Sequence, residues 1–108
     1  MLNGTKAWVT NGERAALVAL AARTDEGVSA FIVEKEPEVS DLPGLTIPPP
    51  LKKLGYKGVE STELVFEDFR TPASSILGGE DQTGVGFKQF MAGIELGRVN
   101  IAARALGI

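Results

Sequence analysis

A stretch in the second half of the chain decides the fold class. Residues 60–68 read ESTELVFED, with Thr62, Leu64 and Phe66 at alternate positions. Successive side chains of a β-strand point to opposite faces, so this alternation predicts a strand with one buried face. Pro72 ends the pattern, because proline cannot donate a hydrogen bond to a strand ladder.

The stretches before it also indicate strands. Residues 6–10 (KAWVT) alternate and stop at Asn11-Gly12, a strong turn dipeptide. Residues 17–22 (LVALAA) form an apolar run of strand length, because the hairpin loop TDEG at 24–27 closes it. Residues 28–34 (VSAFIVE) then predict another strand.

Residues 34–50 are acidic and rich in proline, which is typical of a solvated loop. Residues 45–47 (LTI) could form a short edge strand inside it. A small basic cluster follows, made of Lys52, Lys53 and Lys57. We interpret the cluster as solvated surface, with contact to a phosphate as the alternative.

The period changes to that of a helix after Gly84. Apolar residues recur at i, i+3, i+4 and i+7 through the positions Phe87, Phe90, Met91, Ile94, Ile101, Ala102 and Ala105. The interior of the predicted helix contains Gly93 and Gly97, each of which lowers the stability of the helix by about 1 kcal/mol relative to alanine. Such glycines usually mark close packing against another element. Nothing after this helix could cover its wide apolar surface, so we expect the chain to be part of a larger protein.

The predicted fold class is therefore mainly β: a small antiparallel β-barrel or β-sandwich domain followed by one α-helix. We expect the β-domain, incomplete at its N-terminus, over residues 1–80, and the truncated first part of a helical domain over residues 81–108.

Composition excludes several kinds of chemistry. The 108 residues carry a net charge of −3, which argues against a protein that coats nucleic acid. They contain no cysteine and no histidine, so they offer no disulfide, thiolate nucleophile, serine–histidine–aspartate triad or zincin motif, and we predict no metal site. No apolar run approaches about 18 residues and no signal peptide is evident, so we expect no membrane span and a cytoplasmic or organelle-matrix location.

Two patterns could carry function. Alternation puts Trp8 and Thr10 on one strand face and Val9 on the other, so an indole and a hydroxyl could cover and hydrogen-bond a planar aromatic ligand. The alternative is that Trp8 belongs to the core and Thr10 only precedes a turn. Glu95 and Arg98 lie three residues apart on the predicted helix, where they could form an exposed ion pair or contact a ligand near the two glycines.

The order of segments is more specific than any one of them. Residues 4–12 (GTKAWVTNG), 30–35 (AFIVEK), 53–58 (KLGYKG), 61–72 (STELVFEDFRTP) and 95–98 (ELGR) together resemble the acyl-CoA dehydrogenase family. The resemblance spans nearly the whole chain. It corresponds to the middle β-domain and the first helix of the C-terminal α-domain of a larger α+β flavoenzyme.

The resemblance implies an FAD-dependent enzyme that oxidises an acyl-CoA thioester to the trans-2-enoyl-CoA. Trp8 would cover the flavin ring, Thr10 would hydrogen-bond near its N5 atom, and Val9 would contribute a backbone contact. Glu95 and Arg98 would contact the substrate. Some members place the catalytic glutamate where this chain has Gly97, so we expect the base to lie outside these residues and assign no catalytic residue within them.

The resemblance also implies electron transfer flavoprotein as a partner, a homo-oligomer when the protein is full length, and a bacterial cytoplasmic or mitochondrial matrix location. Two alternatives remain open at this stage. One is a non-catalytic β-sandwich interaction module that pairs through its helix. The other is a related flavin oxidase or monooxygenase.

Overall fold

The computed structural model describes residues 1–107, and these fold as two compact units. The first unit consists of Met1–Val18 and Val33–Pro72. The second consists of Ala19–Ile32 and the residues from Ala73 onward. The boundary between the units falls within two strands, β2 (Leu17–Thr24) and β3 (Gly27–Glu34).

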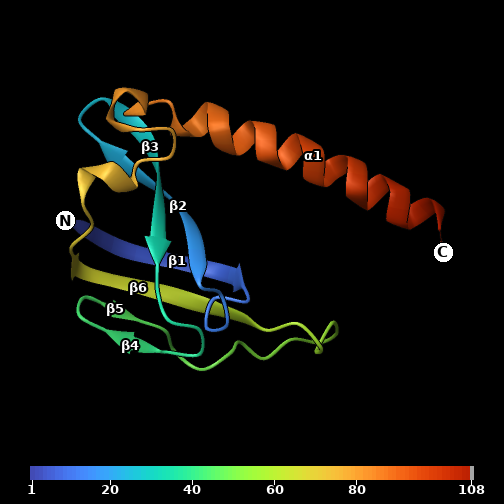
Figure 1. Cartoon of the computed structure of the whole chain (residues 1–108). Coiled ribbons are helices and arrows are strands. Elements are labelled where there is room, and N and C mark those ends of the chain that lie inside the picture. The colour runs from blue at the N-terminus through green and yellow to red at the C-terminus, as the bar shows by residue number, and fades with distance from the viewer. Residues whose placement is uncertain (108) are drawn as a thin grey trace. The chain divides into compact units, whose positions relative to one another are not determined.

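The first unit is built on a four-stranded antiparallel sheet in the order β1-β6-β5-β4 (Figure 1). The strands are β1 (Leu2–Thr10), β4 (Asp41–Leu42), β5 (Leu45–Thr46) and β6 (Ser61–Phe69). The predicted alternation in β6 is confirmed, since Thr62, Leu64 and Phe66 are all buried. The core of this unit also contains Val18, Val33, Leu45 and Ile47.

The short strand predicted at residues 45–47 forms, but it does not lie at an edge. β5 pairs with β6 on one side and with β4 on the other, so β4 rather than β5 lies at this edge of the described sheet. Leu45 and Ile47 are buried in the core, so this part of the predicted solvated loop is packed against the sheet. Burial of these apolar side chains, together with the pairing of β5 with β6, attaches this part of the segment to the sheet.

The second unit contains most of the hairpin of β2 and β3, two single-turn 3₁₀ segments (η1, Ala73–Ser75, and η2, Glu80–Gln82) and helix α1 (Gly86–Leu106). The predicted hairpin loop after Thr24 is confirmed. The hydroxyl of Thr24 donates a hydrogen bond to the carbonyl of Gly27 at 2.9 Å. Ser29 on β3 accepts from the N–H of Gly84 at 2.8 Å. Leu20, Ala30, Phe31 and Ile76 form the core here.

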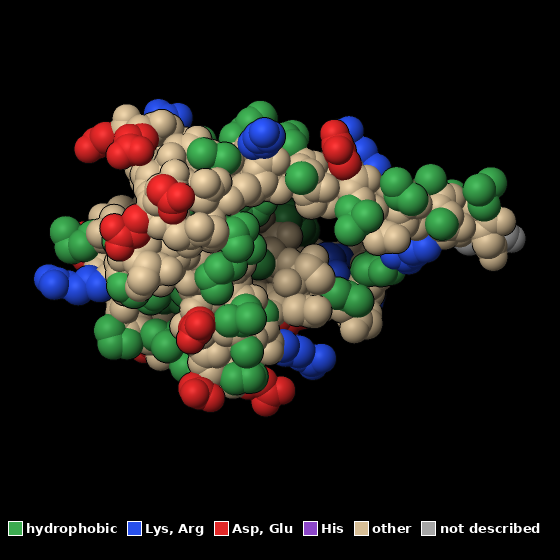
Figure 2. Space-filling model, turned by 45° about the horizontal axis from the view of Figure 1, so that its top comes forward, with side chains coloured by type: hydrophobic (Ala, Val, Ile, Leu, Met, Phe, Trp, Pro, Cys, Tyr) green, Lys and Arg blue, Asp and Glu red, His purple; other side chains and the backbone are tan. Residues whose placement is uncertain are grey.

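Helix α1 confirms the predicted helical period after Gly84. Ile108, the last residue of the expected helical segment, lies outside the described residues. The apolar side chains of α1 are largely solvent-exposed, and Figure 2 shows them spaced along the helix. Within residues 1–107 nothing packs closely against Gly93 or Gly97, because a Cβ added at either would meet nothing within 4 Å. In the part of the chain that the structure describes, no helix is long and apolar enough to cross a membrane.

Candidate functional site at the end of strand β1

The last residues of β1 present an indole and a hydroxyl to solvent. Trp8 is 66% exposed, Thr10 is exposed and Val9 is half-buried. The interpretation of Trp8 as a core residue is therefore wrong for the described structure. An exposed indole and an exposed hydroxyl two positions apart in the sequence fit a planar aromatic group that carries hydrogen-bonding edges, because an indole face can cover such a ring and a hydroxyl can hydrogen-bond its edge.

A β-bulge changes how this segment faces. Lys6 pairs with Leu64 and Val9 with Thr62, so two residues of β1, Ala7 and Trp8, stand opposite a single residue of β6. Trp8 has a left-handed backbone, with φ of 59°. Strict alternation thus fails at Trp8, whereas its prediction that Val9 and Thr10 lie on opposite faces is confirmed by their successive pairing. Bulges of this kind redirect a side chain, and they concentrate near functional sites.

The turn after Thr10 is held by Glu60, a residue that the sequence analysis did not single out. One carboxylate oxygen, Oε1 of Glu60, accepts from the N–H groups of Glu13 at 2.9 Å and Arg14 at 3.3 Å. The carbonyl of Glu60 accepts from the N–H of Asn11 at 3.3 Å. No local signal could have found this role, because it joins residues 46 and more positions apart.

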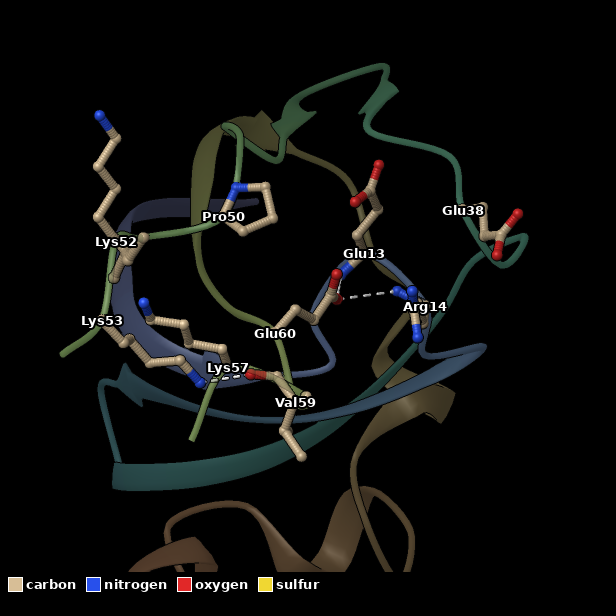
Figure 3. A pocket seen from close by; sticks show the side chains of 11 residues that line it. Glu13, Arg14, Glu38, Pro50, Lys52, Lys53, Lys57, Val59 and Glu60 are labelled. Atoms are coloured by element: carbon tan, nitrogen blue, oxygen red, sulfur yellow. Dashed lines mark hydrogen bonds between the residues drawn. The ribbon is translucent and has the colours of Figure 1, made fainter. Parts of the chain in front are cut away.

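A cleft of about 860 Å³ lies beside this turn in the first unit. Its walls carry the cationic side chains of Arg14, Lys52, Lys53 and Lys57 and the carboxylates of Glu13, Glu38 and Glu60 (Figure 3). The two signs of charge nearly balance, so the cleft is not a strongly cationic anion site. This composition favours solvated surface over phosphate contact for the lysine cluster.

Lys53 has a structural role in the wall of this cleft. Its ammonium donates to the carbonyl of Val59 and, at 3.2 Å, to the hydroxyl of Ser61. It also lies 5.7 Å from the centre of the Tyr56 ring, within cation–π distance. Lys53 therefore fastens the loop of residues 56–60 to the start of β6.

We expect Lys53→Met to lower the free energy of unfolding by about 1–2 kcal/mol, because it removes charge-assisted hydrogen bonds from half-buried acceptors. Lys52→Met is the matched control, since the Lys52 side chain is exposed and makes no hydrogen bond within residues 1–107, and it should change the stability by less than about 0.5 kcal/mol. Urea denaturation measures both. Equal effects at the two positions would contradict the structural role of Lys53.

Glu95 and Arg98 both lie on α1, and both are exposed. Within residues 1–107 no ion pair or hydrogen bond joins their side chains, so the expected surface ion pair is not formed. Such a pair gains only a few tenths of a kcal/mol, which does not offset the entropy of fixing two long side chains. A nearby apolar cavity of about 320 Å³ is lined by residues of the second unit that include Gln89, Phe90 and Ile94, but by neither charged residue.

Residues 1–69 match the family model described as the acyl-CoA dehydrogenase middle domain. The chain belongs to the acyl-CoA dehydrogenase family. Among curated proteins, the short-chain specific acyl-CoA dehydrogenase of human mitochondria is 43% identical over the whole of this chain. The match covers 26% of that relative, so this chain spans about a quarter of the length of the relatives it matches.

Solved structures agree with this family assignment. A chain of a structure described as the electron transferring flavoprotein of Acidaminococcus fermentans aligns with a TM-score of 0.80 and 37% identity, over 97% of this chain and 27% of that one. An acyl-CoA dehydrogenase from Bacillus anthracis, complexed with FAD, aligns with a TM-score of 0.63 and 34% identity. That match covers 77% of this chain and 14% of the other. The mainly antiparallel fold followed by a helix, expected from the family resemblance, is thus confirmed.

Proposed function

We propose that this chain supplies the flavin-facing part of an FAD-dependent acyl-CoA dehydrogenase, which oxidises an acyl-CoA thioester to the trans-2-enoyl-CoA. The observation that carries the proposal is the exposed pair Trp8 and Thr10 at the end of β1, in a chain of this family. The family relative in complex with FAD supports the choice of cofactor.

Three residues of the chain would hold the cofactor. The Trp8 indole would cover one face of the isoalloxazine ring, the Thr10 hydroxyl would hydrogen-bond its edge, and the Val9 backbone would contact it. Bound FAD would supply the oxidising power that no side chain of this sequence has. The part of the protein is to fix the orientation of the ring and to keep water from one of its faces.

Glu95 and Arg98 would contact the acyl-CoA from α1. Neither side chain is engaged within the described residues, so both are available to a ligand. Gly97 cannot act as a base, and the proton at the α-carbon would be taken by a glutamate outside these 108 residues. This assigns binding and orientation, rather than proton transfer, to the chain.

The proposed organisation follows the family. Residues 1–80 would form the middle β-domain and residues 81–108 the start of the C-terminal helical domain. The acceptor of electrons from the reduced enzyme would be an electron transfer flavoprotein, and the full-length protein would be a homo-oligomer. The relatives include a mitochondrial protein of human origin and bacterial proteins, so the proposed location is the mitochondrial matrix or the bacterial cytoplasm.

Anaerobic titration of the flavin-loaded protein with a panel of acyl-CoA esters tests the function. We expect the oxidised flavin band to bleach with at least one ester and to recover when electron transfer flavoprotein is added. Rapid recovery in air without that partner would identify a flavin oxidase instead. Absence of bleaching with every ester, in protein that binds FAD, would contradict dehydrogenase activity.

Arg98→Lys should lower the kcat/KM for acyl-CoA about 3- to 10-fold and leave the melting temperature within about 2 °C. The fixed fork of the guanidinium donates two parallel hydrogen bonds, which an ammonium cannot reproduce. Because Arg98 is exposed and unpaired within residues 1–107, its replacement removes no internal contact. Unchanged kcat/KM would remove Arg98 from the substrate site.

A further inference from the structure

We propose that Glu60 is a positioning residue for the flavin-facing segment Trp8–Thr10. This inference rests on the proposed function. It assigns to a carboxylate outside the flavin contacts the task of fixing the strand end that makes them.

The first support is the hydrogen-bonding pattern at Glu60. Its side chain accepts from two consecutive N–H groups, those of Glu13 and Arg14, and its carbonyl accepts from the N–H of Asn11. Glu60 thus accepts hydrogen bonds from three N–H groups of the turn, and we call this set of bonds the Glu60 clamp. Asn11 directly follows Thr10, so the clamp acts on the residue next to the one that carries the hydroxyl.

The second support is the register of the strands. Thr10 pairs with Ser61, which is the last pair of the β1–β6 ladder, and Glu60 directly precedes β6 in the chain. The contact between Asn11 and Glu60 therefore continues the ladder beyond its regular end. Without it, the final residues of β1 would be free to fray, because strand ends have few partners of their own.

The third support is the packing of the turn. A Cβ added at Gly12 would lie 2.6 Å from Cγ2 of Thr62 and 3.5 Å from Cγ1 of Val9, so the turn is pressed against the ladder. Asn11 has a left-handed backbone with φ of 55°, which only a few residue types adopt readily. The Glu60 carboxylate stabilises this turn by satisfying two of its donors.

The bulge makes such a clamp necessary. Because Ala7 and Trp8 stand opposite one residue of β6, the ladder is interrupted at the start of the segment Trp8–Thr10. The segment Trp8–Thr10 is then held by regular pairing only at Val9 and Thr10. A second anchor at Glu60 fixes it from the other end.

The test uses the flavin-loaded protein and two readouts besides activity: the visible circular dichroism of the bound flavin, and the FAD dissociation constant. We expect Glu60→Ala to change the dichroism and to raise the dissociation constant about 3- to 10-fold. Glu60→Gln keeps one side-chain carbonyl as acceptor and should stay within about twofold of wild type. Glu67→Ala is the matched control, because Glu67 is an exposed carboxylate on β6 whose side chain makes no hydrogen bond within residues 1–107.

Wild-type dichroism and FAD affinity in folded Glu60→Ala would overturn the proposal, and so would equal loss in Glu60→Ala and Glu60→Gln. If Glu60→Ala does not fold, Glu60→Asp takes its place, because the aspartate side chain is one methylene shorter and its carboxylate lies farther from the two N–H groups. The results that support or overturn the proposal are then the same as for Glu60→Ala. Trp8→Ala separates the two levels of inference. If it leaves the flavin dichroism unchanged, the flavin contact itself fails; if it alters the dichroism while Glu60→Ala does not, only the positioning role fails.

Discussion

Replacing Thr10 by valine is expected to slow reduction of the bound flavin by acyl-CoA about 5- to 150-fold, while FAD stays bound and the fold is kept. Valine preserves the β-branched shape and the strand propensity of threonine, so only the hydroxyl is lost. Within residues 1–107 that hydroxyl makes no hydrogen bond, so its removal costs the described structure no internal bond. A buried hydrogen bond to a ligand is worth about 1–3 kcal/mol, which gives the stated range of rates.

Stopped-flow bleaching of the oxidised flavin band at saturating acyl-CoA measures this effect. Thr5→Val is the matched control, because Thr5 is an exposed threonine on the same strand, regularly paired with Val65 on the other side of the bulge. It should leave the rate within about twofold of wild type. Reduction at the wild-type rate in Thr10→Val would remove Thr10 from the site.

Gly86→Ala is expected to lower the free energy of unfolding by about 3 kcal/mol, at the upper end of the usual cost of overpacking. Gly86 is the first residue of α1 and the buried one, and an added Cβ would fall on the backbone of Ser29 and Ala30. Ala30 is itself buried in β3, and its carbonyl accepts from the N–H of Leu77 at 2.8 Å. Because the backbone of a paired strand cannot move aside easily, relieving the clash requires α1 or β3 to shift.

Urea denaturation of the chain tests this, with Gly93→Ala as the contrast. Gly93 lies in the interior of the same helix and a Cβ there meets nothing, so alanine should raise the stability by about 0.5–1 kcal/mol. The same glycine-to-alanine substitution at two positions of one helix is thus expected to change the free energy of unfolding in opposite directions. A Gly86→Ala variant as stable as wild type would show that the start of α1 does not pack against β3.

Local patterns predicted the elements of this chain well. The alternation of Thr62, Leu64 and Phe66 reflects one buried face, and the change of period after Gly84 reflects a helix, since both are properties of neighbouring residues. The order of the motifs correctly indicated that the chain belongs to the acyl-CoA dehydrogenase family.

Features that depend on distant residues could not be predicted in the same way. The bulge at Trp8 depends on which residues of β6 stand opposite β1, and the sequence of β1 alone continues to alternate through it. The interior place of β5 depends on pairing with both β4 and β6. The Glu60 clamp joins residues almost fifty positions apart, so it is visible only once the strands are paired.

The pairing of β1 with β6 has a consequence for how the chain folds during synthesis. All of residues 11–60 must be made between these strands, which takes about 3–10 s at roughly 5–20 residues per second. Throughout that interval β6, the strand that pairs with β1 within residues 1–107, is not yet made, and the ladder that carries Trp8 and Thr10 cannot begin to form. Closure of such a distant contact is slow compared with forming a local hairpin such as β2 and β3. Residues Trp8–Thr10 are therefore synthesised well before their partner strand β6, and they are among the last residues of the first unit to acquire their structure.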